Sequence, residues 1–303
     1  INFLAAQEPL AVARLVAEYQ RGQAHHRLEA RIIQEPNGGN GIARLRKEVL
    51  LDGVKRKSNE IIGQLNAVLF LPQMLRVIEG APEERRRYLN LALSQVVPYY
   101  PVALAEYHRV LTQRNALLRG LSEHGGDPAQ LDFWDKQLAD SGAHLIYARI
   151  RAVQELERLA ARFHRELTHG EEVLRICYQP SYDPLPGAQQ GQLAMALDTE
   201  VDRSKFSLEK IHAGFLSRLG QLRQEEMIRG MTTIGPHRDE LRFLSNGIDL
   251  GMYGSRGQVR TMVLSLKLAE VAWMREKTGE WPILLLDEVL AELDAQRRVD
   301  LLT

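Results

Sequence analysis

Two adjacent carboxylates, Asp287 and Glu288, follow directly on the apolar run 283–286 near the end of the chain. An aspartate at the end of a strand can bind Mg²⁺, and a glutamate beside it can polarise a water molecule. Open α/β sheets bind their ligands at the carboxyl ends of the strands. The pair therefore suits metal-dependent phosphoryl transfer, and a buried strand with a solvated acidic end is the structural alternative.

The element that positions this pair is expected to be a strand. Residues 283–286 are four branched apolar residues in succession, and Pro282 precedes them. Runs without alternation are typical of parallel strands covered on both faces, so we expect a fully buried strand here. An apolar strand that ends in such an acid pair has the layout of an ATPase Walker B segment. A further acid, Asp294, follows shortly afterwards.

A second group of small and polar residues, 254–258, precedes a strongly helical segment, 259–277. Free amides at a helix amino terminus form an anion site, and the helix dipole favours phosphate there. Ser255 can donate its hydroxyl, while Gly257 lets the backbone approach a ligand closely. An ordinary helix cap is the alternative interpretation of Gly-Ser before a helix. The segment is separated from the acid pair by about one helix and one strand, which favours a shared role.

Length, charge and cysteine content narrow the class of protein. The chain has 303 residues, which favours two lobes over one compact core. Acidic and basic residues balance at 39 each, so any contact with DNA must come from a local patch. Cys177 is the only cysteine, which excludes an internal disulfide and suits a reducing cytoplasm. No apolar stretch approaches the ~20 residues that span a bilayer.

The first part of the chain is expected to form strands. Residues 1–8 do not resemble a signal peptide, and without an initiating methionine the chain is expected to be part of a longer one. Residues 11–33 and 44–54 contain short β-prone pieces, and the glycine-rich residues 35–41 are interpreted as the turn between two strands. No glycine in the chain is followed by lysine, so the phosphate-binding pattern GxxxxGK[ST] is absent from these residues.

The middle of the chain is expected to be helical. A short apolar run, 68–71, ends at Pro72 and is followed by Gln73. Helical spacing then recurs over 83–96 and 99–118. Along residues 131–167, apolar positions keep one face for about 37 residues, which is roughly 55 Å of helix. This long helix either packs the core of a helical lobe or forms a coiled-coil arm. Five arginines between its glutamates are interpreted as a solvated face: Arg149, Arg151, Arg158, Arg162 and Arg165.

Three adjacent arginines, Arg85, Arg86 and Arg87, lie near the start of the first of these helices. Consecutive residues point in different directions on a helix, so the three side chains do not share one face. A solvated face paired with Glu83 and Glu84 and a functional basic patch both fit them.

Strands and helices alternate in the last third. We expect a strand over 173–178, a loop over 180–192 and a charged helix over 194–229. A hairpin is expected to join 241–244 to 248–250 through the turn Ser-Asn-Gly. The preceding residues His237, Arg238 and Asp239 are either a buried structural ion pair or functional. The overall pattern is a sheet-forming start, a helical middle and a sheet-forming end.

Together, these stretches resemble a known family. The sequence Tyr-Gly-Ser-Arg-Gly-Gln at 253–258, the run 282–288 and Glu-Leu-Asp at 292–294 look like the signature, Walker B and D-loop of an ABC-type ATPase head. The family whose pattern they match is RecF, bacterial DNA replication and repair proteins related to SMC heads. Further matching stretches are 70–73 and 77–89 around the Q-loop, 113–115, 134–138 and 235–239.

The resemblance implies a role for each polar residue of these motifs. Asp287 would bind Mg²⁺, and Gln73 would sense the γ-phosphate and the metal. Glu288 would orient the attacking water, in a position where many relatives carry aspartate. The residues that would contact a nucleotide held by a second subunit are Ser255, Gly257, Gln258 and Asp294. Arg85, Arg86 and Arg87 would contribute to phosphate-directed DNA contacts.

The resemblance also implies a function and its partners. ATP and Mg²⁺ would be the cofactors, and an ATP-dependent homodimer would clamp DNA and release it after hydrolysis. The expected partners are gapped DNA or single-strand/double-strand junctions and mediators of the RecO and RecR type, with no membrane. The implied fold is α/β, an ABC-ATPase head with a mixed-sheet lobe I and a mainly helical lobe II. Residues 1–80 would belong to lobe I through the Q-loop, 81–235 would form lobe II, and 236–303 would complete lobe I.

The chain departs from the family pattern at both ends. The family's Walker A loop would lie ahead of Ile1, and its switch histidine would lie beyond Thr303. Residues 1–303 are therefore expected to hold half of a composite site, and alone they are expected to bind ATP poorly or not at all. An ATPase is the function expected for the parent protein, and a non-hydrolysing interaction module is the alternative for this chain.

Overall fold

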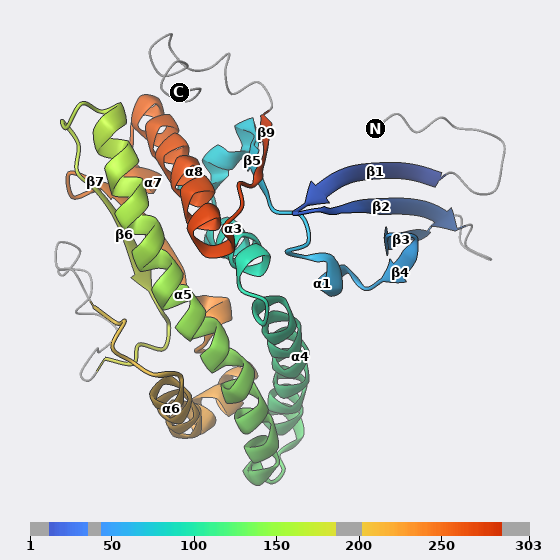
Figure 1. Ribbon diagram of the computed structural model, residues 1–303. Helices are drawn as coiled ribbons and strands as arrows, with labels where there is room; N and C mark the ends of the chain where they lie inside the picture. The colour runs from blue at the N-terminus through green and yellow to red at the C-terminus, as the bar shows by residue number, and fades with distance from the viewer. Residues whose placement is uncertain (1–11, 36–43, 186–201, 287–303) are drawn as a thin grey trace. The chain divides into compact units, whose positions relative to one another are not determined.

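The computed structural model describes residues 12–35, 44–185 and 202–286, and the chain forms two compact units, 1–64 and 65–303 (Figure 1). The division into 1–80, 81–235 and 236–303 that the sequence suggests has different boundaries from these two units and stays a prediction. Within the described residues, no helix is both long enough and apolar enough to cross a membrane.

The first unit is an antiparallel meander whose strands pair in the order β1-β2-β3-β4. β2 and β3 pair from Leu28 opposite Leu51 to Glu35 opposite Arg44, so the strands expected on both sides of the glycine-rich stretch are present. Residues 36–43 between them lie outside the described residues. The elements are β1 (Val12–Arg21), β2 (Ala24–Glu35), β3 (Arg44–Leu51), β4 (Val54–Arg56) and the short helix α1 (Ser58–Ile61).

The second unit combines two small sheets with a set of helices. β5 and β9 pair in parallel, whereas β6, β7 and β8 form an antiparallel sheet. The elements from β5 to α5 are β5 (Ala67–Phe70), η1 (Pro72–Leu75), α2 (Arg76–Glu79), α3 (Pro82–Val96), α4 (Tyr100–His124), η2 (Pro128–Gln130) and α5 (Leu131–Leu167). Those that follow are β6 (Leu174–Gln179), α6 (Leu208–Arg229), η4 (Pro236–Arg238), β7 (Glu240–Ser245), β8 (Ile248–Asp249), α7 (Leu250–Tyr253), α8 (Arg256–Thr278) and β9 (Ile283–Leu286).

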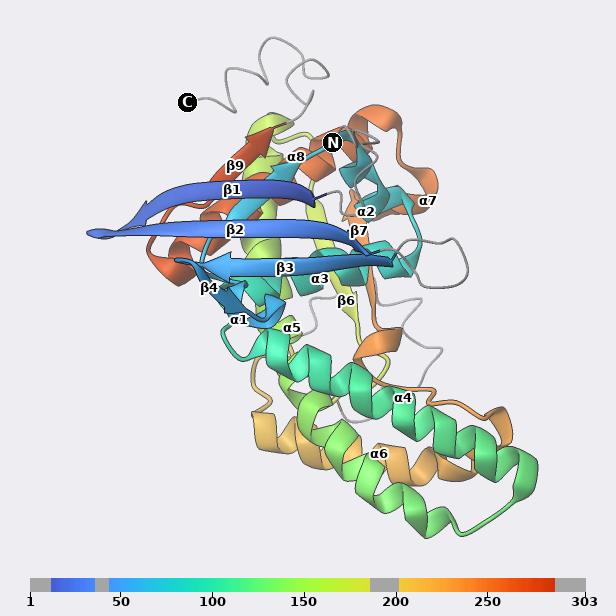
Figure 2. The same ribbon diagram turned by 90° about the vertical axis from the view of Figure 1, so that its right-hand side faces the viewer.

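The long helix α5 is the centre of the second unit (Figures 1 and 2). It spans 37 residues, as the apolar spacing predicts. The helices α4, α6 and α8 and the strand β6 all pack against it. Leu138, Leu145 and Leu156 on its apolar face are buried. The face therefore packs the core of this unit, which is the first of the two roles expected for it.

Helix ends follow the capping residues in the sequence. Pro82 opens α3, with Glu83 and Glu84 in its first turn, where the helix dipole favours acids. Ser207 caps α6 by accepting a hydrogen bond from the backbone N–H of Lys210. The expected helix over 194–229 therefore begins later, at Leu208; residues 202–207 are not helical, and 194–201 lie outside the described residues.

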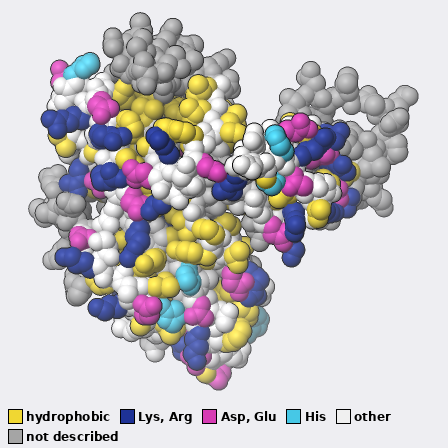
Figure 3. Space-filling model, in the orientation of Figure 1, with side chains coloured by type: hydrophobic (Ala, Val, Ile, Leu, Met, Phe, Trp, Pro, Cys, Tyr) yellow, Lys and Arg dark blue, Asp and Glu magenta, His cyan; other side chains and the backbone are white. Residues whose placement is uncertain are grey.

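The strand expected over 283–286 is present as β9, and it pairs with β5 in parallel. The expectation that it is fully buried is wrong, because its four side chains are 40–48% exposed. Within the described residues, β5 is its one strand neighbour, so one edge of β9 has no pairing partner there. Leu69 and Trp281 are also exposed, and hydrophobic side chains gather on this part of the surface (Figure 3).

Candidate functional site

The amino terminus of α8 carries three of the residues singled out in the sequence. Ser255 Oγ accepts a hydrogen bond from the backbone N–H of Gln258 at 3.2 Å, and Gln258 Oε1 accepts one from the N–H of Ser255 at 3.1 Å. This reciprocal capping box fixes the first turn of the helix. Ser255 and Gly257 remain exposed. The same turn can therefore be an ordinary helix cap and also present exposed residues to a ligand.

Two glycines at this end of α8 differ in why they lack a side chain. A Cβ on Gly254 would lie 2.6 Å from the Leu250 carbonyl oxygen, so packing within the chain requires a glycine there. A Cβ on Gly257 would meet nothing closer than Ser255 Oγ at 3.9 Å, an ordinary contact. Packing with the described residues gives no reason for a glycine at 257. An anion that approaches the backbone closely would supply one.

Gln258 is also held by a polar group from outside α8. Its Nε2 donates a hydrogen bond to Glu172 Oε1 at 3.3 Å. Glu172 Oε2 accepts hydrogen bonds from Ser245 Oγ at 2.6 Å and His164 Nε2 at 3.1 Å. Burial raises the pKa of the Glu172 carboxyl, but the hydrogen bonds from Ser245, His164 and Gln258 outweigh it and leave the pKa below its ordinary value. The carboxylate is therefore ionised at neutral pH.

Gln73 lies beyond the carboxyl end of β5, in η1, with its side chain exposed. In the parallel pair, Phe70 at the end of β5 is opposite Leu286 at the end of β9. Asp287 is the next residue in the chain after Leu286, but Asp287, Glu288 and Asp294 lie outside the described residues. Among the described residues, no hydrogen bond joins Gln73 to the amino terminus of α8.

The three adjacent arginines of α3 have different surroundings. Arg85 forms a two-point ion pair with Glu240, at 2.6 and 2.9 Å, and donates to the Gly80 carbonyl at 2.7 Å. Arg86 donates to the Asp239 carbonyl at 2.9 Å. Arg87 is exposed, and no hydrogen bond or ion pair links it to another described residue. Arg85 and Arg86 therefore join α3 to β7 and to the residue before it. Of the three arginines, only Arg87 has a guanidinium that is not engaged by another described residue.

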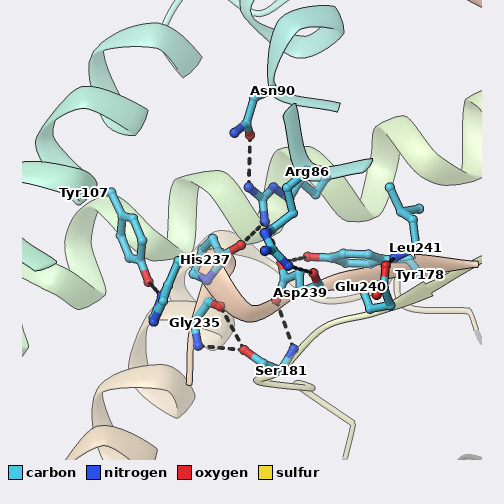
Figure 4. Close-up of polar contacts among 12 residues, drawn as sticks. Arg86, Asn90, Tyr107, Tyr178, Ser181, Gly235, His237, Asp239, Glu240 and Leu241 are labelled. Atoms are coloured by element: carbon cyan, nitrogen blue, oxygen red, sulfur yellow. Dashed lines mark hydrogen bonds and ion pairs between the residues drawn. The ribbon is translucent and has the colours of Figure 1, made fainter. Parts of the chain in front are cut away.

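Asp239 is the centre of a buried polar cluster at the start of β7 (Figure 4). Its carboxylate accepts hydrogen bonds from Arg149 Nη1 at 2.7 Å, the Tyr178 hydroxyl at 2.5 Å and the Ser181 N–H at 2.9 Å. Arg149 also donates to Asn90 Oδ1 at 3.0 Å. Arg149, expected on a solvated face, is therefore buried, because α5 turns it toward this carboxylate. Arg158, Arg162 and Arg165 are exposed as expected, and Arg151 is half-buried.

His237 has its own role in this cluster. Its Nδ1 lies 2.7 Å from the Tyr107 hydroxyl (Figure 4). Its Nε2 lies 3.4 Å from the Thr232 carbonyl oxygen. Burial lowers the pKa of His237 to about 4, so the ring is neutral at pH 7. A carbonyl can only accept, so Nε2 carries the proton and Nδ1 accepts from Tyr107. Of the three residues 237–239, only Asp239 forms a buried ion pair within the described part of the chain, and its partner is Arg149 in α5; His237 is neutral and Arg238 is exposed.

Two further stretches that matched the family pattern form a second buried cluster. Arg114 in α4 pairs with Asp135 in α5 at 2.7 Å and with Glu226 in α6 at 2.7 Å, and all three side chains are fully buried. Asn115 accepts a hydrogen bond from the Thr232 N–H at 2.8 Å. These polar contacts join α4, α5 and α6, so the stretches 113–115 and 134–138 stabilise the helical region.

Comparison with known proteins identifies the family. The chain is 41% identical to the DNA replication and repair protein RecF of Chloroflexus aurantiacus over 295 residues, which cover 96% of this chain and 71% of the relative. It is 40% identical to the RecF protein of Roseiflexus castenholzii, over 94% of this chain and 70% of that protein. The chain belongs to the RecF family. A scan against protein-family models found no match.

Solved structures agree with this assignment. A structure of the recombination mediator protein RecF with an ATP analogue, in the RecFOR pathway, superposes with a TM-score of 0.76 at 29% identity. It covers 96% of this chain, which spans 71% of that chain. A RecF–ATP structure superposes with a TM-score of 0.72 at the same identity. The fold class is therefore confirmed as α/β, an ABC-ATPase head with a mixed-sheet lobe and a mainly helical lobe.

Two residues next to the candidate site, Glu172 and His164, were not singled out from the sequence. Glu172 follows Gly170 and Glu171 and resembles an ordinary surface acid. His164 stands on the apolar face of α5, where a buried polar side chain needs a partner, and this was the one available signal. Within the described residues, no group of three or more His, Cys, Asp or Glu side chains is arranged to hold a metal ion.

Proposed function

We propose that this protein is an ATP-dependent DNA-binding ATPase of recombinational repair and replication restart, acting in the cytoplasm. ATP with Mg²⁺ joins two subunits, the dimer holds DNA at gaps or at single-strand/double-strand junctions, and hydrolysis releases it. Partners of the RecO and RecR type belong to the same proposal. Support comes from the membership of the RecF family and from the naming of its relatives as DNA replication and repair proteins.

The observation that carries the proposal is the open amino terminus of α8. Its first turn is held by the capping box of Ser255 and Gln258. Packing against the described residues does not require a glycine at position 257. The exposed amides and hydroxyl of such a turn suit the phosphates of a nucleotide. In the proposal, Ser255, Gly257 and Gln258 contact the nucleotide of the partner subunit, and Asp294 crosses the same interface.

Mg²⁺ fits the donor set that the proposal gives it. Asp287 and Gln73 offer a carboxylate and an amide oxygen, both of them ligands that Mg²⁺ prefers. Phe70 and Leu286 are opposite each other at the ends of the parallel strands β5 and β9. Because residues that follow two parallel strands leave the sheet at the same edge, this register supports a shared role of Gln73 and Asp287. The bound cation would neutralise charge on the transferred phosphoryl group. Glu288 would accept a hydrogen bond from the attacking water and orient it.

The proposal is tested with the full-length protein and two substitutions. Glu288→Gln should bind ATP, remain a dimer and fail to hydrolyse, as light scattering and phosphate release would show. Gly257→Ala should melt at the wild-type temperature, because its Cβ has space within the chain, but should lose ATP-dependent dimerisation. A wild-type protein that is monomeric with and without ATP would contradict the dimer and favour a non-hydrolysing interaction module.

Contact with DNA phosphates is assigned chiefly to Arg87 among the three arginines. Arg85 and Arg86 are engaged in contacts with β7 and its start, whereas Arg87 is exposed. Loss of one phosphate contact lowers the slope of log K against log salt by ~0.9 for duplex DNA. Arg87→Ala should show this change in fluorescence anisotropy at several salt concentrations. An unchanged slope removes Arg87 from the DNA contacts.

A further inference from the structure

Glu172 links the candidate nucleotide-contacting turn to the rest of the unit. One carboxylate oxygen accepts from Gln258 Nε2 at 3.3 Å, and the other accepts from Ser245 Oγ at 2.6 Å and His164 Nε2 at 3.1 Å. The capping box uses the other end of the Gln258 amide, its Oε1. The two contacts together hold the Gln258 side chain at both of its polar atoms.

The backbone around Glu172 is itself held on both sides. At the end of α5, the N–H of Gly170 donates to the Arg165 carbonyl at 2.8 Å, and Gly170 adopts a φ of +84°, which favours glycine. After Glu172, the N–H of Val173 donates to Asn246 Oδ1 at 2.8 Å, in the turn between β7 and β8. The backbone on the two sides of Glu172 is therefore held by the end of α5 and by this turn.

His164, which contacts Glu172, also makes a second contact with α8. The ring is fully buried, and its Nδ1 lies 3.0 Å from Ser265 Oγ. Ser265 is two turns beyond Gln258 on α8, about 10 Å along the helix axis. Ser265 in turn donates to the Thr261 carbonyl at 2.7 Å. The first turns of α8 are thus joined to the last turn of α5 at two points, through Glu172 and His164.

We propose that Glu172 is a positioning residue for the contact that Gln258 makes with the partner's nucleotide. The inference rests on the proposed function of Gln258. An ionised carboxylate only accepts hydrogen bonds, so it fixes the orientation of the Gln258 amide with Nε2 toward Glu172 and Oε1 toward the Ser255 N–H. Without Glu172, the amide is free to rotate away from the cap, and the first turn of α8 loses its restraint from α5. His164 supports Glu172 from the buried side.

The test uses the full-length protein with Glu172→Ala, Gln258→Ala and the double variant. ATP-dependent dimerisation, measured by analytical ultracentrifugation, should weaken about tenfold in each single variant, the size expected for one charge-assisted hydrogen bond. The double variant should be no weaker than Gln258→Ala, because Glu172 acts through Gln258. Affinity of the monomer for ATP should stay unchanged in all three. Additive effects in the double variant would overturn the inference.

Controls separate this role from general stability. Glu171 is exposed next to Glu172, and its side chain makes no hydrogen bond or ion pair with another described residue, so Glu171→Ala should behave as wild type. Glu172→Gln keeps the shape of the side chain but cannot accept at both ends, so it should retain the melting temperature and still weaken dimerisation. If Glu172→Gln and Glu172→Ala both dimerise as wild type does, the inference is overturned.

Hydrogen exchange without nucleotide gives a readout that does not depend on the dimer. The amides of the first turns of α8 should exchange faster in Glu172→Ala than in wild type and Glu171→Ala. Unchanged exchange in Glu172→Ala would overturn the inference even if dimerisation is weakened. A wild-type protein that never dimerises with ATP would instead overturn the proposed function, and the inference with it. The two failures are therefore distinguishable.

Discussion

Loss of the Asp239 carboxylate should strongly destabilise the second unit. In Asp239→Asn, the buried Arg149 guanidinium loses its ion pair at 2.7 Å while both residues remain nearly fully buried, at 2–3% exposure of their side chains. Breaking a buried pair by removing one charge costs about 3–5 kcal/mol, because the remaining charge is uncompensated. For a unit of this size, ~1 kcal/mol corresponds to about 2–4 °C in melting temperature. The expected loss is therefore roughly 6–20 °C.

The assay is thermal unfolding followed by circular dichroism at neutral pH, with an exposed ion pair as the matched control. Arg158 and Glu276 are 3.0 Å apart, but their side chains are 61% and 50% exposed. Glu276→Gln should therefore cost at most about 1 kcal/mol. If Asp239→Asn melts within a degree or two of Glu276→Gln, the reasoning that Asp239 compensates a buried charge is refuted.

Two further outcomes follow from packing and from titration. A Cβ on Gly142 in α5 would lie 2.6 Å from Phe215 Cε1, so Gly142→Ala should destabilise by about 1–3 kcal/mol, whereas Gly220→Ala, which meets nothing within 4 Å, should stabilise by ~0.5–1 kcal/mol in urea unfolding. An equal response of the two would contradict this packing. The depressed pKa of His237, about 4, means that its contribution to stability is present above the ordinary value of 6.5 and is lost as the pH falls through 4. Its ring resonances in NMR should therefore not titrate between pH 5 and 8, and a midpoint near 6.5 would contradict its burial.

The helices and strands of the second unit were largely predictable from the sequence, because their apolar spacing is long and regular. The bounds of α5 follow from an apolar stripe of many turns. The parallel partner of β9 did not follow, since pairing joins Ala67–Phe70 to Ile283–Leu286 across most of the chain. Local patterns carry no information about which distant strand is the neighbour, nor about how much of the strand stays exposed.

The residues of the candidate site could be identified from the sequence where they stand together in a short motif, but not where their role depends on burial. Ser255, Gly257 and Gln258 stand together in the sequence and share one turn of α8. Arg149 was assigned to solvent together with Arg158, although its neighbours at helical spacing are all apolar: Leu145, Ile146, Ala152 and Val153. Arg158 has polar neighbours at that spacing and is exposed, whereas Arg149 lies in the core and pairs with Asp239. The spacing therefore held a signal for the burial of Arg149, but its partner at the start of β7 depends on tertiary packing.

The polar contacts of α5 lie at three levels along a single helix. Asp135 near its start pairs with Arg114, Arg149 in its middle pairs with Asp239, and His164 in its last turn contacts Glu172. Asp135 and His164 are separated by about 43 Å at 1.5 Å per residue. Because the three pairs attach one continuous helix to α4, to the start of β7 and to the segment before β6, α5 fixes these parts of the unit relative to one another.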